Sequence, residues 1–412
     1  MKLKMFILFS VLSLLFAGCA REKHDISFNV GGAPAEISVW QEVVREFTDT
    51  TGIRVKINIQ PTDSDLRRQG LVLPLAAKRA EPDVFLMDIA WIGQFAASGW
   101  LAPVEISDKA RAAFFRGVIE TADTYDNRLI GLPVYIDGGL LYYRKDIVKK
   151  PPDSWEELVR ICVENGRQGE NPCFVWQGAQ YEGLVCNFLE FALANGGGII
   201  IEGNRADINT AENREALRFM AGLIHKHKVS PPDTYTSMRE EESRIAFEES
   251  GALFQRNWPY AWGIYSQEGS PVKGKTGIAP LPGFKGKKGA STLGGWHIGI
   301  SAFSKNKEAA LRLVEHITSY DVQKRFAIKM GWNPGREDVY DDKDVLEASP
   351  HFKQLKEVFV NASARPNVPY YTRLSSVLQK HLNAALMMKT GAEEALEAAE
   401  KEINAIIREY EK

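Results

Sequence analysis

The sequence predicts an α/β protein of two lobes, between which the chain passes more than once. Strand-like and helix-like segments alternate over residues 26–88, an order that is typical of a lobe built on a mostly parallel sheet. Two extended segments rich in Pro and Gly, residues 130–138 and 276–284, lie far apart in the chain and suit hinge strands between lobes. The 412 residues, 44% of them hydrophobic, are enough to bury two cores.

Periodicity predicts the elements of the first lobe. Four apolar residues keep helical spacing, namely Trp40, Val43, Val44 and Phe47. The strand over 83–88 is apolar on both faces, as in a buried parallel sheet, and the strand over 54–60 alternates between apolar and polar residues. The expected order is strand 26–30, a helix that ends near Gly52, the alternating strand 54–60, a helix from Thr62 to about Lys78, and the apolar strand 83–88.

The later part of the chain is expected to be mainly helical. A capping box formed by Thr390 and Glu393 would open the last helix. The expected elements are a largely helical region over 151–228, a strand over 252–257, helices within 305–330 and 373–411, and a third crossing between lobes at 331–335.

The N-terminus has the pattern of an export signal. Lys2 and Lys4 precede an apolar run over residues 5–16, which is too short to span a bilayer comfortably and has the shape of a signal peptide. We therefore expect residues 1–18 to be a signal peptide and the mature protein to be exported, to the periplasm or another extracytoplasmic space.

A cysteine follows this run directly. Ala17-Gly18-Cys19 resembles a bacterial lipobox, although Phe16 replaces the usual Leu. The prediction is that Cys19 is lipidated and that residues 19–25 are a short tether to the membrane. A plain secretory signal with an incidental cysteine is the alternative.

Three cysteines lie in the body of the chain, and export would permit disulfides. Cys162 and Cys173 flank a polar loop and could pair or stay free. Cys186 lies in an apolar stretch and is expected in a core.

Composition and motifs exclude several classes of function. The net charge of −2 favours neither sign, so no nucleic-acid surface is indicated. Residues 269–276 match the P-loop expression, but no hydrophobic strand precedes them, an extended segment follows, and Pro271 removes a needed N–H group. Because no metal or nucleophile motif has supporting context, no catalytic residue, metal or cofactor is expected.

Polar residues beside aromatic rings at strand ends are the strongest indication of a site. Asp88 and Asp137 end predicted strands, Trp258 follows another, and Trp296 comes after Gly294 and Gly295, which allow a close backbone approach. Sugars stack their C–H faces on such rings and bond their hydroxyls to charged acceptors. The alternative is that each Trp belongs to a core and each Asp caps a helix.

The segment Asn257–Gly263 combines three large rings with a proline. Trp258 ends the strand and is the expected platform for a sugar ring. Pro259 is well placed as the first residue of a helix, which Tyr260 and Trp262 would pack into its lobe.

Ordered blocks over nearly the whole chain, from about Ile26 to the last helix, resemble the trehalose/maltose-binding proteins of ABC importers. These belong to the family 1 extracellular solute-binding proteins. The resemblance implies a periplasmic-binding-protein fold of the second type, with lobes at 26–133 plus 282–331 and at 134–281 plus 332–412. The blocks are residues 84–91, 93–100, 132–137, 141–146, 256–262, 293–299 and 365–371.

The resemblance also implies a set of ligand-binding residues. Glu36 and Asp88 would accept sugar hydroxyls, and Arg68 would donate to them, with Arg67 as the alternative if the register slips by one. The remaining residues of the implied site are Tyr135 and Asp137 at the first crossing, Trp258 as the stacking ring, Trp296 with the backbone of Gly294 and Gly295 on the facing side, and Arg365 from the late segment.

The expected function is therefore that of a monomeric, membrane-tethered receptor. It would bind an α-glucosidic disaccharide, trehalose or maltose, and deliver it to the permease subunits of an ABC importer. Two alternatives stay open: a glycoside hydrolase whose carboxylates are Glu36, Asp88 and Asp137, and a binder of a polyol or other non-disaccharide.

Overall fold

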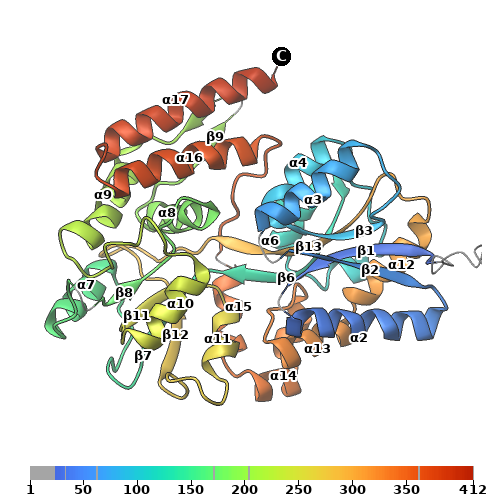
Figure 1. Ribbon diagram of the computed structural model, residues 1–412, viewed down its shortest axis with the longest axis horizontal. Coiled ribbons are helices and arrows are strands. Elements are labelled where there is room, and N and C mark those ends of the chain that lie inside the picture. The colour runs from blue at the N-terminus through green and yellow to red at the C-terminus, as the bar shows by residue number, and fades with distance from the viewer. Residues whose placement is uncertain are drawn as a thin grey trace, which may run out of the picture.

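The computed structural model describes residues 24–32, 34–61, 64–169, 172–202, 205–360 and 362–411. The predicted signal peptide, Cys19, most of the tether and Thr62 lie outside these residues. Two α/β lobes lie side by side, and strands β6 and β13 run toward the region between them (Figure 1). Within the described part of the chain, no helix combines the length and apolarity needed to cross a bilayer.

The sheet of the first lobe has the strand order β2-β1-β3-β13-β6. Its first three strands are parallel, as expected, but β13 is antiparallel to both neighbours. The reason is the path of the chain: β13 starts at the cleft edge on its return from the other lobe, so it runs away from the edge at which β3 ends. The strands are β1 (Ile26–Gly31), β2 (Val55–Gln60), β3 (Val84–Asp88), β6 (Leu132–Gly138) and β13 (Leu293–Ile300).

Helices cover both faces of this sheet (Figure 1). The expected helical segment 305–330 is two helices, because the Ser319 side chain accepts a bond from the Val322 N–H and starts a new helix. The main helices are α2 (Pro34–Thr51), α3 (Ser64–Ala76), α4 (Ile92–Ala97), α12 (Lys307–Ile317) and α13 (Tyr320–Met330). Short elements complete the lobe: η1 (Ile89–Trp91), α5 (Asp108–Arg111), α6 (Arg116–Val118), the π-helix η2 (Ile119–Asp123), β4 (Thr124–Tyr125) and β5 (Arg128–Leu129).

The sheet of the second lobe has the order β12-β7-β11-β8. Strand β7 is antiparallel to β11 and β12, whereas β8 and β11 are parallel. These strands are β7 (Leu140–Arg144), β8 (Phe174–Val175), β11 (Phe254–Asn257) and β12 (Thr276–Pro280), with a separate hairpin of β9 (Ile200–Glu202) and β10 (Arg205–Asp207). The helices are α7 (Trp155–Glu164), α8 (Glu182–Ala194), α9 (Ala211–His225), α10 (Glu240–Glu249), α11 (Tyr260–Tyr265), α16 (Tyr371–Leu386) and α17 (Ala392–Tyr410).

The chain passes between the sheets where Gly139 joins β6 to β7, close to the expected first crossing. The expected second crossing is displaced: β12 is paired within the second sheet, so the passage lies between Pro280 and Leu293. The third passage starts beside β6, where the Ile136 N–H donates to the Asn333 carbonyl, and continues through η3 (Glu337–Asp341), α14 (Lys343–Ala348) and α15 (Phe352–Val360). The expected lobe boundary at 133/134 falls inside β6 and stays a prediction.

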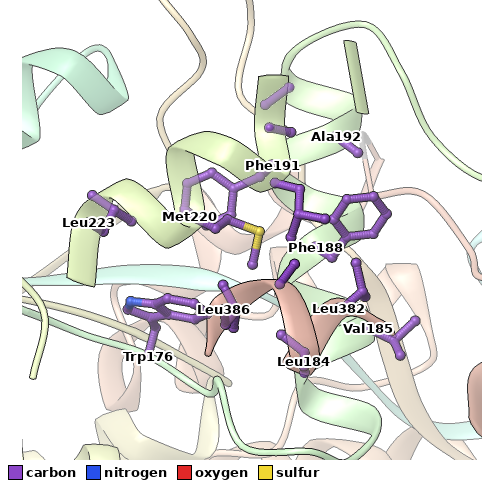
Figure 2. Close-up of a cluster of buried hydrophobic side chains, with 14 of the residues drawn as sticks. Trp176, Leu184, Val185, Phe188, Phe191, Ala192, Met220, Leu223, Leu382 and Leu386 are labelled. Carbon is purple, nitrogen blue, oxygen red and sulfur yellow. The ribbon is translucent and has the colours of Figure 1, made fainter. Parts of the chain in front are cut away.

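Each lobe has its own apolar core, and a third cluster joins them. In the second lobe, α8 lies against α9 and α16, and their side chains meet around Phe188 and Met220 (Figure 2). In the first lobe, Trp40 packs edge-on against Phe28, with 5.5 Å between the ring centroids. The joining cluster combines Phe85 of β3 with Tyr142 of β7, so the lobes share packing at their junction.

Three local expectations concern the cysteines, the start of the last helix and the P-loop-like segment. Cys162 and Cys173 form a disulfide, with an S–S distance of 2.06 Å, and Cys186 is buried and free. The capping box was wrong: Gly391 is the N-cap of α17, and no side chain caps that end. Strand β12, not a helix, follows the P-loop-like segment, which confirms that the match was accidental.

Candidate functional site

A cavity of about 410 Å³ lies between the lobes, at the edge of the first sheet where β3 ends. Nine of the predicted residues line it, from elements that are far apart in the sequence. They are Glu36, Asp88, Tyr135, Asp137, Trp258, Gly294, Gly295, Trp296 and Arg365. Among the described residues, no cluster of His, Cys, Asp and Glu could hold a metal ion.

Arg68 does not line the cavity, and its neighbour Arg67 does. The Arg68 guanidinium donates to Gln94 Oε1 at 3.2 Å, outside the cavity wall. The Arg67 guanidinium lies 4.3 Å from the centre of the Trp296 ring. Consecutive helical residues point about 100° apart, so a slip of one residue decides which arginine reaches the site. The alternative assignment is therefore the one that the geometry supports.

Trp258 forms part of the wall from the second lobe, directly after β11. Its half-buried ring is held at the indole Nε1, which donates to Glu240 Oε1 at 3.3 Å. The Arg256 guanidinium carbon lies 3.9 Å from the ring centre, so one ring face is already occupied. Pro259, expected as the first residue of α11, is its N-cap with helical dihedral angles.

The two glycines of β13 leave room for close neighbours, Gly294 for the Trp258 ring and Gly295 for the Tyr135 backbone. A Cβ atom on Gly294 would lie 3.2 Å from the Trp258 ring, and one on Gly295 would lie 2.4 Å from the Tyr135 carbonyl oxygen. Gly295 also has a φ of +131°, which L side chains rarely adopt. The expectation of a close backbone approach is thus confirmed.

A bridge of charges joins the lobes along the lining of the cavity. Arg365 is almost fully buried and donates to Glu182 Oε1 of α8 at 2.8 Å and to Asp88 Oδ1 of β3 at 3.3 Å. The other bond of Asp88 Oδ1, at 2.8 Å, is accepted from the Ala90 N–H, where Asp88 caps η1. Asp88 thus has both of the roles considered for it, because it caps the helix η1 and also lines the cavity.

Asp137 lies among other acids. Removal from water raises the pKa of its carboxyl to about 7, and the nearby Asp88 and Glu36 carboxylates add to this rise, while a bond from Asn333 opposes it. That bond, from Asn333 Nδ2 to Asp137 Oδ1, is long, at 3.4 Å. Burial also raises the pKa of Tyr135 well above its usual value, and its ring stacks on Trp332 with 4.6 Å between centroids. A ligand hydroxyl could donate to the Asp137 carboxylate and stabilise its charged form.

Sequence reasoning missed much of the second-lobe wall. Tyr260, expected only to pack α11, also lines the cavity, and its hydroxyl donates to Glu241 Oε1 at 2.6 Å. The segment 331–335 was noted as a crossing but contributes to the wall as well. The other missed residues are Ser64, Tyr181, Glu182, Gly183, Cys186, Arg239, Glu240, Glu241, Gly331, Trp332 and Asn333. Most come from helices and loops with no pattern of their own.

Comparison with known proteins decides the class. The family model described as bacterial extracellular solute-binding protein matches residues 32–324, more than half of the chain. The chain belongs to this family. Its two-lobed α/β architecture is accordingly the fold of the periplasmic binding proteins.

Similar proteins agree with this assignment. A probable ABC transporter-binding protein of Deinococcus radiodurans is 35% identical over 370 residues, which are 86% of this chain and 87% of the relative. The solved structure of maltose-bound MalE3 from T. maritima has 39% identity and a TM-score of 0.84, covering 92% of this chain and 99% of that one. A solute-binding protein from Thermotoga lettingae bound with α-D-tagatose has 27% identity and a TM-score of 0.81, covering 93% and 100%.

This solute-binding protein is a component of an ABC transporter and not an enzyme, because its family and relatives are binding proteins of such transporters. The glycoside hydrolase interpretation of Glu36, Asp88 and Asp137 is therefore wrong. Their carboxylates line the cavity between the lobes.

Proposed function

We propose that this protein captures a neutral α-glucosidic disaccharide of the trehalose or maltose type. The observation that carries the proposal is the pairing of two walls across one cavity. Trp258 belongs to the second lobe on one side, and Arg67, Asp88, Gly294 and Trp296 belong to the first lobe on the other.

The chemistry of these walls suits a sugar. The apolar face of a pyranose ring stacks on an indole, and its hydroxyls bond to carboxylate acceptors and guanidinium donors. The volume of about 410 Å³ falls within the range of small-molecule sites. A maltose complex of the 39% identical relative supports the choice of disaccharide.

Closure of the lobes would complete the site. Residues on the first lobe bind the sugar in an open form. The second lobe then closes and brings Trp258 and the Arg365 bridge into contact with the bound sugar. Only contacts made in the closed form shift the population toward closure. The closed receptor would deliver its sugar to the membrane permease as an exported monomer, tethered through a lipid on Cys19.

A panel of ligands tests the proposal. The protein is mixed with trehalose, maltose, sucrose and tagatose, and the melting temperature and released glucose are measured together. We expect a rise in melting temperature with trehalose or maltose and no product. A rise in melting temperature with tagatose alone would mean that the ligand is a monosaccharide and not a disaccharide. No rise with any of the four sugars would refute the sugar site.

A further inference from the structure

A buried ion pair lies behind the Trp258 ring and outside the cavity wall. Arg256 and Glu190 are each about 1% exposed. Arg256 Nε donates to Glu190 Oε2 at 2.8 Å, Nη2 donates to Glu190 Oε1, and Nη1 donates to Gln177 Oε1 at 3.1 Å. The guanidinium is therefore held in a forked arrangement that fixes its plane.

This guanidinium is also the surface on which the Trp258 ring rests. The 3.9 Å from its central carbon to the ring centre is a cation–π contact at close range. Glu190 comes from α8, whereas Arg256 and Trp258 come from β11 and the residue after it. The orientation of the ring thus depends on a carboxylate from another element.

The same carboxylate contacts both of the first two passages between the lobes. The Thr292 N–H, just before β13, donates to Glu190 Oε1 at 3.2 Å. A Cβ atom on Gly139, between β6 and β7, would lie 2.1 Å from Glu190 Oε1 and 2.7 Å from Arg256 Nη2. The two passages are joined to each other as well, because Ser291 Oγ donates to the Gly139 carbonyl at 2.9 Å.

We propose that Glu190 and Arg256 are a positioning pair, which holds the Trp258 ring for its ligand and ties it to the two passages at Gly139 and Thr292. Burial of an ion pair costs folding free energy unless its hydrogen bonds are satisfied. Replacing such a pair by two apolar residues often leaves the stability of the fold unchanged. Its location behind the ring and against both passages gives the pair a role that apolar residues would not fill. The proposal rests on the proposed role of Trp258 in binding sugar.

The test observes the ring itself. The protein is labelled with 5-fluorotryptophan, which marks its nine tryptophans, and the Trp258 resonance is identified by its loss in Trp258→Phe. In Glu190→Gln the Trp258 resonance should shift or broaden without ligand, while that of Trp40 in the first-lobe core stays in place. Sugar affinity, measured by calorimetry, should fall about tenfold, as expected for a weakened cation–π support.

Two further variants separate position from stability. Glu190→Leu combined with Arg256→Met removes both charges and restores a foldable core, but the Trp258 resonance and the affinity should stay altered. Gly139→Ala pushes on the pair from the first passage and should also move the Trp258 resonance. Asp83→Asn is the matched control: Asp83 is buried and bonded to Ser27 and Ser304 at the far end of β3, so its loss should lower the melting temperature alone.

The outcomes are distinct. A folded double variant with an unchanged Trp258 resonance and affinity within twofold of the parent would overturn the positioning role. An unmoved resonance in Gly139→Ala would overturn the link to the passages. If the parent binds no sugar of the panel, the proposed function fails, yet the fluorine spectra still decide whether the pair positions the ring.

Discussion

Replacement of Trp258 by Ala should remove most of the affinity for sugar. One face of the ring rests on Arg256 and its edge lies near Gly294, so one face is left for the ligand. A buried Trp covers about 150–250 Å² in total, and one face accounts for roughly 60–100 Å² of that area. At about 25 cal/mol per Å² this face contributes about 1.5–2.5 kcal/mol. The ring-specific attraction adds about 0.5–1 kcal/mol.

The total loss of about 2–3.5 kcal/mol corresponds to a Kd that is roughly 30- to 400-fold higher. Titration calorimetry with the sugar that stabilises the parent measures it, and circular dichroism checks that the variant is folded. Trp258→Phe is the matched control, because it keeps a smaller ring face and loses the bond from Nε1 to Glu240. We expect it to stay within about fivefold of the parent. A folded Ala variant that binds within threefold of the parent would refute the stacking role.

Three other predictions follow from the geometry. Arg67→Ala should weaken binding about tenfold or more, whereas Arg68→Ala, outside the cavity, should change it less than threefold; calorimetry that showed the reverse would restore Arg68 to the site. Cys162→Ser opens a disulfide that spans 11 residues and should lower the free energy of unfolding by about 3 kcal/mol in urea titrations, with sugar affinity unchanged. Asp137→Asn should alter how stability depends on pH. Because the Asp137 pKa rises from 3.8 to about 7 on folding, the folded ligand-free protein holds an extra proton between about pH 4 and 7. Its stability therefore falls as pH rises through that window, by up to about 1.4 kcal/mol per pH unit.

The Asp137→Asn variant should lack this contribution, so the difference between the two stability curves isolates it from all other groups. Equal slopes for parent and variant in urea titrations at pH 4.5 and 6.5 would show that the folded protein carries Asp137 ionised. The Arg67 and Arg68 variants serve as controls for each other, since both remove one arginine charge from the same helix.

Strand ends such as Asp88 and Trp258 could be placed because the apolar pattern stops there, and ligands of α/β lobes collect beyond the carboxyl ends of strands. The capping box at Thr390 failed because a four-residue pattern has little specificity, and the helix begins one residue later, with Gly391 as its cap. The second-lobe wall, such as Tyr181 and Glu240, could not be predicted because no local pattern marks these residues.

The sequence by itself determined the order of the elements, the two-lobed α/β class and most residues of the first-lobe wall. The order of the elements depends on hydrophobic spacing, and Asp88 and Asp137 depend on strand ends, which are local properties, whereas Glu36 was implied by the family resemblance. Only the tertiary structure decided that Arg67, and not Arg68, reaches the cavity, because that depends on how α3 is rotated against the sheet. It also decided that Glu190 bonds to Arg256 behind the Trp258 ring, since Glu190 and Arg256 are 66 positions apart and only the tertiary structure brings them together.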